Sequence, residues 1–402
     1  MEPLIKQFID RYLSRKEIAY RLPVRMPIGV FWPEIFEERK RNAIELPLKD
    51  QQGRSFWYVL NRSIEQQADR VAEIARRDIA FAELPLEPDD GLIDEAVFSS
   101  VIEGAFTSRA EAAKLIRGDL PPRNKSEQMV KNNYRALLFV LEHLDEPVTK
   151  SMLVTIAGML TQDASDELVD DYRGGMVYVT GREGVVYTPP EAGKVAEMMD
   201  ALIGFVNSCE IHPVLKACIA HFYLVYVHPF RDGNGRTARA LSYMILLRSG
   251  YDYFRYFSIS GMIAEERGRY YRSMLDAENE ENGGNDMTYF IDYYTAMLVR
   301  VIQRMEEHLR THVIAGRIRA SMEKARLYNE RQIAGMEWLV RNSFDHVTAE
   351  QWKKKFGTAL ETARKDLTRL AETGLLERNV DGRKAVFTLD DSQGALLRLL
   401  SD

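Results

Sequence analysis

The sequence predicts a mainly α-helical protein with one β-hairpin near its middle and a winged helix-turn-helix unit at its C-terminal end. Apolar residues recur at helical spacing through most of the chain, as at Ile64, Ala68 and Val71. Residues 172–190 interrupt this pattern with two β-type runs. Near the C-terminus, three short helical patterns precede two further β-type runs, as in a winged helix.

In chain order, residues 19–58 contain prolines and paired aromatic residues, which favour extended segments and turns over helix. An amphipathic helix is predicted over 63–82, and another over 93–103 ends before Gly104. Further helices are predicted over 126–144, 150–161, 191–207, 212–226, 236–250, 264–279 and 285–325.

The predicted hairpin consists of the runs MVYVT and GVVYT, which flank Gly-Arg-Glu and are followed by Pro189 and Pro190. Three short helices are predicted over 331–342, 348–357 and 359–374, and two strands around an Asp-Gly turn over 375–389. We therefore expect an N-terminal region over 1–115, a central domain over 116–325 and a winged helix-turn-helix domain over 326–402.

Composition restricts the class of protein. With 54 Lys and Arg against 60 Asp and Glu, the net charge of −6 argues against attraction of the whole chain to nucleic acid or to anionic membranes. The two cysteines, Cys209 and Cys218, have no metal-finger spacing and are expected to be reduced. The chain begins without the apolar core of a signal peptide and has no membrane-length apolar run, so we expect a cytoplasmic protein.

The chemistry is concentrated in HPFRDGNGRTAR, residues 228–239. An apolar run over 222–227 ends at His228, and a loop containing Gly233, Asn234 and Gly235 then enters an apolar helix. Backbone amides of a glycine-rich turn at a helix N-terminus favour anions, so this loop is a candidate phosphate cradle.

Charged groups surround this loop. Arg236 and Arg239 lie three positions apart on one helix face, where two guanidinium groups can bind phosphate oxygens. Asp232 could hold Mg²⁺ against the same phosphates, and His228 has a proton affinity suited to deprotonating a hydroxyl near neutral pH. Each feature alone is typical of a helix end, a turn or a solvated face, but together they predict phosphoryl or nucleotidyl transfer.

These twelve residues resemble the signature of the Fic family, His-x-Phe-x-(Asp/Glu)-Gly-Asn-Gly-Arg-x-x-Arg, at every signature position. The resemblance extends over about residues 95–310 and implies a Fic-type helical bundle that transfers AMP from ATP to a hydroxyl of a target protein. It implies that His228 is the general base, Phe230 anchors the loop and Asp232 holds Mg²⁺. It further implies that the α and β phosphates bind Gly233, Asn234, Gly235 and Arg236, and that the γ phosphate binds Arg239.

Two further segments resemble parts of that family. The hairpin resembles the flap that holds the target segment by strand-type hydrogen bonds, with Val179, Thr180 and Tyr187 as candidates for its edge. Tyr270 and Tyr271 match a tyrosine pair near the nucleoside. Where relatives often have Asn seven residues after that pair, this chain has Glu278.

The segment FSSVIEGAF, residues 98–106, resembles the family's inhibitory motif, (Ser/Thr)-x-x-x-Glu-(Gly/Asn). Ser99 and Glu103 are one helical turn apart, and Gly104 can cap the helix. The resemblance implies that Glu103 pairs with Arg239 and takes the place of the γ phosphate. Some relatives use the same glutamate to remove AMP, so the favoured direction of the reaction stays open.

Alternatives of other classes also stay open. Residues 350–385 hold nine Lys or Arg against six acids, so the winged helix could bind DNA, in which case the chain could be a nucleotide-sensing regulator. A winged helix can also serve contacts with other proteins. Candidates for such contacts are Thr362, Arg364, Lys365, Arg369, Arg383 and Lys384. Some relatives transfer other nucleotides or phosphocholine, and a homodimer is expected by analogy with the family.

Overall fold

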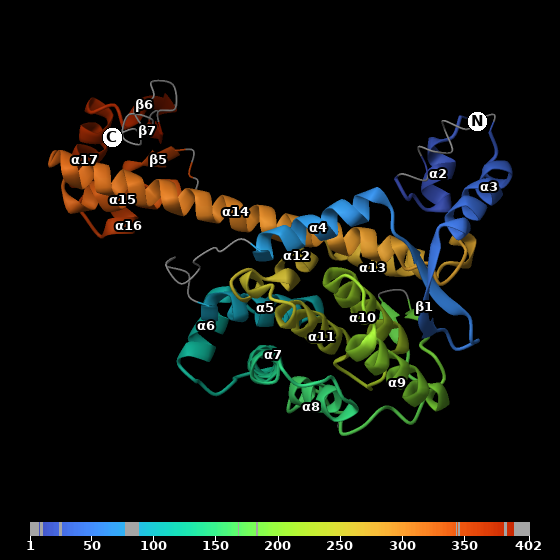
Figure 1. Ribbon diagram of the computed structural model, residues 1–402. Helices are drawn as coiled ribbons and strands as arrows, with labels where there is room; N and C mark the ends of the chain where they lie inside the picture. Colours follow the sequence, from blue (N-terminus) through green and yellow to red (C-terminus); the bar gives the residue numbers. More distant parts are fainter. Residues whose placement is uncertain are drawn as a thin grey trace. The chain divides into compact units, whose positions relative to one another are not determined.

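The computed structural model describes residues 8, 11–23, 26–76, 88–167, 169–181, 184–342, 344, 346–381 and 384–389 (Figure 1). The chain divides into two compact units, Met1–Ile302 and Gln303–Asp402. Helices make up most of both, which confirms the predicted fold class.

The first elements described in the larger unit are two helices, α2 (Arg15–Arg21) and α3 (Ile28–Arg41), and a hairpin of β1 (Ala43–Lys49) and β2 (Ser55–Val59). The hairpin agrees with the extended structure predicted for 19–58, but α3 does not. In α3, Phe31, Ile35 and Arg39 recur every four residues and are buried, so packing of this stripe outweighs the backbone donor that Pro33 removes.

The rest of this unit is mainly helical in its described residues. Its helices are α4 (Arg62–Arg76), α5 (Pro88–Ile102), α6 (Arg109–Arg117), α7 (Lys125–Glu142), α8 (Lys150–Thr161), α9 (Ala192–Ser208), α10 (Pro213–Val227), α11 (Asn234–Arg248), α12 (Ile259–Glu265), α13 (Arg267–Glu278) and the first part of the long α14 (Thr288–Ala325). The segment predicted as one helix over 264–279 is divided between α12 and α13, and α6 was not predicted. The end of the helix predicted over 63–82 lies outside the described residues.

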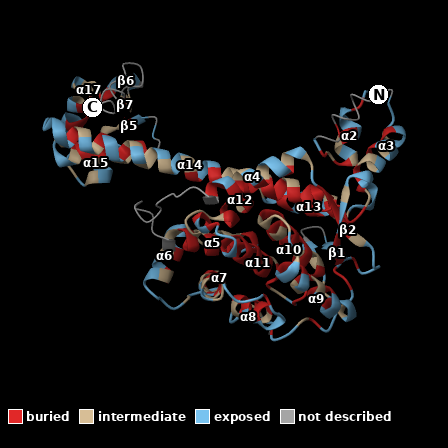
Figure 2. Ribbon diagram, viewed as in Figure 1, coloured by how far each residue is buried: buried red, intermediate tan, exposed pale blue. Residues whose placement is uncertain are grey.

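Helices α10 and α11 form the centre of this unit (Figure 2). They pack against each other, and each is buried along nearly its whole length. Because both are buried on nearly every side, neither shows a strong amphipathic pattern, as expected of helices enclosed by others. The loop that joins them carries His228 and the glycine-rich segment, so the candidate site is held between two rigid, buried elements.

The central hairpin is present but shorter than predicted. Its strands are β3 (Val179–Gly181) and β4 (Gly184–Tyr187), paired antiparallel with Val179 opposite Tyr187 and Thr180 opposite Val185. Its turn residues, 182 and 183, lie outside the described residues. Val185 and Val186 are more than half exposed, at 57% and 54%.

The smaller unit contains the C-terminal part of α14, then α15 (Glu330–Arg341), α16 (Ala349–Phe356) and α17 (Leu360–Glu372). Strands β5 (His346–Thr348), β6 (Leu376–Asp381) and β7 (Lys384–Leu389) form one antiparallel sheet in the order β5-β7-β6. The three helices and the final hairpin match their predicted positions, while β5 is an additional strand. Their core includes Ile318, Met336, Trp352, Leu367 and Phe387.

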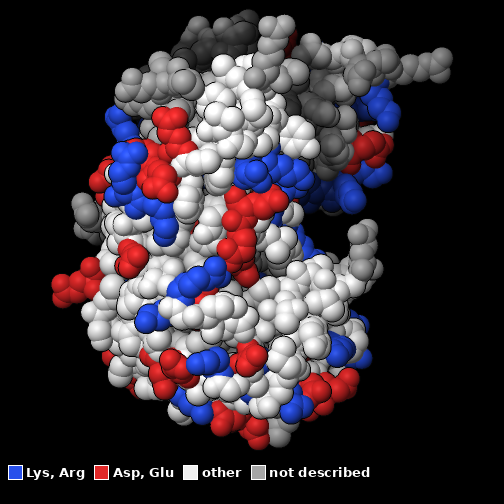
Figure 3. Space-filling view, turned by 90° about the vertical axis from the view of Figure 1, so that its right-hand side faces the viewer, with Lys and Arg blue, Asp and Glu red and all other residues white. Residues whose placement is uncertain are grey.

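Surface charge agrees with the near balance of acids and bases in the sequence. On the face shown in Figure 3, Lys and Arg side chains alternate with Asp and Glu side chains, and neither sign covers a broad area. Within the described ranges, no helix has both the length and the apolar character needed to cross a membrane.

Candidate active site

His228 caps the C-terminus of α10 and adopts a left-handed backbone conformation, with φ 52° and ψ 58°. Its imidazole Nδ1 lies 3.2 Å from the Val225 carbonyl oxygen, which assigns the proton to Nδ1 and leaves the Nε2 lone pair available. Burial lowers the pKa of His228 below its ordinary value, although the Val225 carbonyl and the charge of Glu103 partly oppose this. The ring is therefore neutral near pH 7 and can accept a proton.

The loop after His228 is held in place from within. Phe230 is completely buried, and its backbone N–H and carbonyl both bond the side-chain amide of Asn234, at 2.9 and 2.8 Å. Gly233 has φ 81°, a conformation that glycine adopts without strain, and α11 begins at the next residue. The first amides of a helix have no acceptor within it, so those of Asn234, Gly235 and Arg236 form an anion-binding end.

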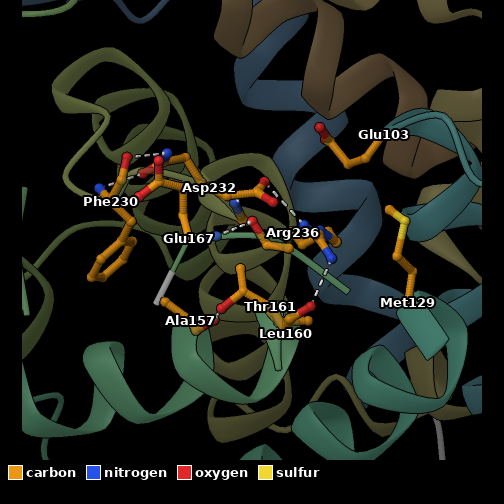
Figure 4. Close-up of polar contacts among 12 residues, drawn as sticks. Glu103, Met129, Ala157, Leu160, Thr161, Glu167, Phe230, Asp232 and Arg236 are labelled. Atoms are coloured by element: carbon orange, nitrogen blue, oxygen red, sulfur yellow. Dashed lines mark hydrogen bonds and ion pairs between the residues drawn. The ribbon is translucent and has the colours of Figure 1, made fainter. Parts of the chain in front are cut away.

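Arg236 lies beneath this loop and is 3% exposed. Its Nη1 donates to the Leu160 carbonyl at 2.7 Å, and its Nη2 donates to Asp232 Oδ1 at 3.2 Å (Figure 4). Asp232 Oδ1 also accepts the backbone N–H of Gly233, and the carboxylate is 41% exposed. The bonds to Leu160 and Asp232 fix the Arg236 guanidinium at the base of the loop. Both donors to Asp232, Arg236 Nη2 and the Gly233 N–H, bond Oδ1 and not Oδ2.

Arg239 lies one turn further along α11 and is also 3% exposed. Its Nε donates to Ser99 Oγ at 2.9 Å, while its Nη2 donates to the Ser99 carbonyl at 2.9 Å and to Glu103 Oε1 at 2.8 Å. The remaining nitrogen, Nη1, is buried without a hydrogen-bond partner in the described structure and lies beside Gly235. A buried cationic donor of this kind is costly unless an anion binds it.

Glu103 reaches the same point from α5. Its carboxylate is 31% exposed and lies so close to Gly235 that a Cβ built there would overlap Oε1. Gly104 follows with φ 95°, which ends the helix and directs Glu103 over the loop. The structure thus brings Ser99, Glu103 and Arg239 together.

Helix α5 is anchored by Glu95, which sequence reasoning did not identify. This buried carboxylate accepts hydrogen bonds from Ser258 Oγ at 2.7 Å and from the Ser260 N–H at 2.9 Å, at the N-terminus of α12. Closer to the start of α5, a Cβ on Gly91 would overlap the Arg255 carbonyl. The helix that carries Glu103 is therefore fixed at two points along its length.

The tyrosine pair and Glu278 lie at different depths. Tyr270 is 2% exposed, and its hydroxyl lies 2.7 Å from His221 Nε2 in the core. Tyr271 is 39% exposed. Burial raises the pKa of Glu278 to about 8, so this carboxyl group is protonated at neutral pH. Glu278 is near enough to raise the pKa of Tyr187 as well, although burial is the larger cause there.

The hairpin meets α10 through its last strand residue. Tyr187 donates its hydroxyl hydrogen to the Tyr226 carbonyl at 2.6 Å, two residues before His228. Val179 pairs with Tyr187, and Thr180 lies next along β3. The hairpin residues named from the sequence therefore lie on an element that is attached beside the imidazole.

A divalent cation would find a suitable ligand in Asp232. No group of three or more His, Cys, Asp or Glu side chains gathers as metal ligands would among the residues that the structure describes. Mg²⁺, however, commonly takes one or two protein carboxylates together with substrate phosphates and water. The partly exposed carboxylate of Asp232, beside an anion cradle, fits that pattern.

Part of this chain is similar in sequence to known proteins. Residues 147–246 match the model of the Fic/DOC family. Over 84 residues the chain is 42% identical to the protein adenylyltransferase Fic of Drosophila willistoni and 40% identical to that of Aedes aegypti. Each match covers 20% of this chain and 16% of the relative, so the chain spans only a small part of those proteins.

A solved structure supports the fold. The crystal structure of a Fic family protein from Desulfovibrio desulfuricans G20 is similar over 84% of this chain and 98% of its own, with a TM-score of 0.55 and 19% sequence identity.

Proposed function

We propose that this chain is a protein adenylyltransferase, which transfers AMP from ATP to a hydroxyl of a target protein, because residues 147–246 match the model of the Fic/DOC family. One observation carries the proposal: a neutral imidazole stands beside a glycine loop at which the buried Nη1 of Arg239 has no partner within the described structure. The curated relatives named protein adenylyltransferase support it.

In the proposed reaction, the α11 N-terminus and Arg236 bind the α and β phosphates of ATP, and Arg239 binds the γ phosphate. His228 Nε2 takes the proton of the incoming hydroxyl as its oxygen bonds to the α phosphorus. The bond between the α phosphorus and the bridging oxygen breaks, and pyrophosphate leaves. Mg²⁺ held by Asp232 would neutralise charge on the phosphates.

Glu103 is proposed to restrain this reaction. Its carboxylate is bonded to the guanidinium that the terminal phosphate needs, and it covers Gly235 within the cradle. ATP could enter only with that phosphate displaced, which spoils the in-line geometry on which phosphoryl transfer depends. The same carboxylate could orient a water molecule and remove AMP from a modified target.

The hairpin is proposed to hold the target. Its exposed strands could pair with an extended segment, and Tyr187 fixes β4 to α10 beside His228. Val179 and Thr180 are the proposed contacts on β3. A target hydroxyl held in this way would lie near Nε2.

Incubation of the Glu103→Gly protein with labelled ATP, GTP, UTP or CTP in a cell lysate tests the proposal. Labelled protein should appear with ATP, and the Glu103→Gly/His228→Ala double variant should give none. Labelling by another nucleotide alone would favour a different transferred group, and labelling that persists in the double variant would refute the role of His228.

A second candidate function is DNA binding by the smaller unit. Lys353, Lys354 and Lys355 are exposed in the last turn of α16, and Arg364 and Lys365 are exposed on α17, the proposed recognition helix. Two arginines of α17 lie near acids, Arg364 at 3.9 Å from Glu361 and Arg369 at 3.6 Å from Glu372, which reduces their attraction for phosphate. Arg383 lies outside the described residues.

Retention on duplex DNA separates the two candidates. A DNA-binding regulator would be retained in a salt-dependent manner, equally in the parent and in the His228→Ala variant, and would lose retention when the three α16 lysines become Ala. Absence of retention at low salt would exclude this candidate.

A further inference from the structure

Arg173 lies at the base of the central hairpin and is 3% exposed. Every hydrogen bond of its guanidinium in the described structure goes to a main-chain carbonyl. Nε donates to His228 O at 2.7 Å, Nη1 to Gly175 O at 3.0 Å, and Nη2 to Val227 O at 3.2 Å and to Pro190 O. A buried guanidinium that donates only to main-chain carbonyls connects the chain segments to which those carbonyls belong.

These carbonyls belong to two functional elements. Gly175 and Pro190 bracket the hairpin on both sides, whereas Val227 and His228 end α10. The last carbonyls of a helix have no partner within it, and an Arg at a helix C-terminus satisfies them favourably. The backbone N–H of Arg173 adds a bond to Pro229 O at 2.8 Å. One residue therefore joins both ends of the hairpin to the turn that carries the imidazole.

The backbone of His228 needs such support. A residue with a Cβ is strained at φ 52° and ψ 58°, and persists there only where its surroundings determine the conformation. Arg173 binds the carbonyl of His228 and the carbonyl of the next residue, Pro229, so it holds the chain on the C-terminal side of the strained position. The imidazole then takes its direction from a backbone that cannot relax.

We propose that Arg173 is a positioning residue that holds His228 in its left-handed conformation, aims Nε2 at the reacting hydroxyl, and transmits the position of the hairpin to the imidazole. This inference rests on the proposed adenylyl transfer. Lysine cannot replace all of these contacts, because one ammonium nitrogen cannot take the places of the three guanidinium nitrogens that bond these four carbonyls.

The test is the Arg173→Lys substitution in the Glu103→Gly protein, with Arg231→Lys as the matched control. Arg231 is exposed and pairs with Glu167 at 2.8 Å, on the same loop but away from the cradle. We expect kcat for AMP transfer to fall roughly 100-fold with Arg173→Lys, as for a small misplacement of a reacting group. The Kd for ATP should be unchanged, because Arg173 contacts none of residues 233–239, and Arg231→Lys should leave both values unchanged.

A second readout does not depend on activity. In protein labelled with ¹⁵N-histidine, the His228 ring signals, assigned with the His228→Ala variant, report which nitrogen carries the proton. In the parent protein, which keeps Arg173, the signals should show the proton on Nδ1. In Arg173→Lys they should move towards a mixture of the two tautomers. Should Arg173→Lys fail to fold, Arg173→Gln, which keeps one planar amide donor, is measured in the same way.

Failure of the role proposed for Arg173 can be distinguished from failure of the proposed function. Equal kcat and equal ring signals in Arg173→Lys and its parent would overturn the role of Arg173, as would a loss of kcat that is matched by a loss of ATP affinity. If the Glu103→Gly protein transfers no AMP at all, the proposed function fails, and the ring signals still decide whether Arg173 sets the direction of His228.

Discussion

Replacement of Glu103 by glutamine should strengthen ATP binding by removing the charge that competes for Arg239. The Arg239 side chain is 3% exposed and Glu103 31% exposed, and they share one hydrogen bond of 2.8 Å. A hydrogen bond between charged groups contributes about 1.5–3 kcal/mol, and partial exposure of Glu103 places this one near the lower end. Since 1.4 kcal/mol corresponds to a tenfold change, we expect a Kd for ATP roughly tenfold lower in Glu103→Gln.

Isothermal titration with a non-hydrolysable ATP analogue and Mg²⁺ measures this effect. Glu167→Gln is the matched control, because it removes a carboxylate that also lies 2.8 Å from an arginine, Arg231, but at the exposed side of the loop. Glu103→Gly should bind the analogue at least as tightly as Glu103→Gln, since it also uncovers Gly235. Equal Kd values in Glu103→Gln and the parent would refute competition between carboxylate and phosphate at Arg239.

Three further results are expected. His228→Ala in the Glu103→Gly protein should lower the rate of AMP transfer by roughly 10²–10⁴-fold without loss of ATP binding. In the Glu103→Gly protein that keeps His228, the rate should be flat around pH 7 and fall only in acid, below the ordinary histidine range, because burial lowers the pKa of His228. A rate that already falls as the pH drops from 8 to 7 would contradict this. Gly91→Ala should destabilise the larger unit by about 1–3 kcal/mol in thermal unfolding, because its Cβ meets the Arg255 backbone, whereas Gly193→Ala, with open space around it, should not. Asp366→Ala should cost about 1–3 kcal/mol in the smaller unit, because it leaves the buried indole N–H of Trp352, now 3.2 Å from the carboxylate, without an acceptor; an unchanged melting temperature would exclude this role.

The acidic limb of the rate profile has a counterpart in stability. The folded-state pKa of His228 is lowered, so between that pKa and the ordinary one the unfolded chain binds a proton that the folded chain does not. The free energy of unfolding therefore falls as the pH drops from the unfolded pKa of about 6.5 to the lowered folded pKa, and this histidine causes no further change below it. His228→Ala should remove that part of the pH dependence.

The loop of the candidate site could be predicted because its residues are contiguous. His228, Asp232 and the glycines follow one another in the chain, so their spacing alone places them at a junction between helices. The contact between Glu103 and Arg239 joins residues 136 positions apart, and only the family resemblance indicated it. Helix α3 was mispredicted because local signals from Pro33 and the aromatic residues outweighed, in the sequence, a buried stripe that becomes decisive only when it packs.

Other functional positions could not have been predicted. Arg173 binds main-chain carbonyls, two of them 54 and 55 residues away, and carbonyls have no sequence signature. Glu95 is an acid in a helical segment, which the sequence alone favours as a solvated residue, until the N-terminus of α12 folds against it. In both cases the partner is a backbone group, and its position depends on the tertiary fold.

The anchoring of α5 determines where motion is possible. Gly91 and Glu95 hold the first half of the helix against neighbouring backbone, while Glu103 follows its last residue and Gly104 ends it. Withdrawal of the whole helix would break both anchors, but rotation of one side chain, or loosening of the final turn, would break neither. Under the restraint proposed for Glu103, the site can therefore open through a local change at the end of α5, with no rearrangement of the surrounding helices.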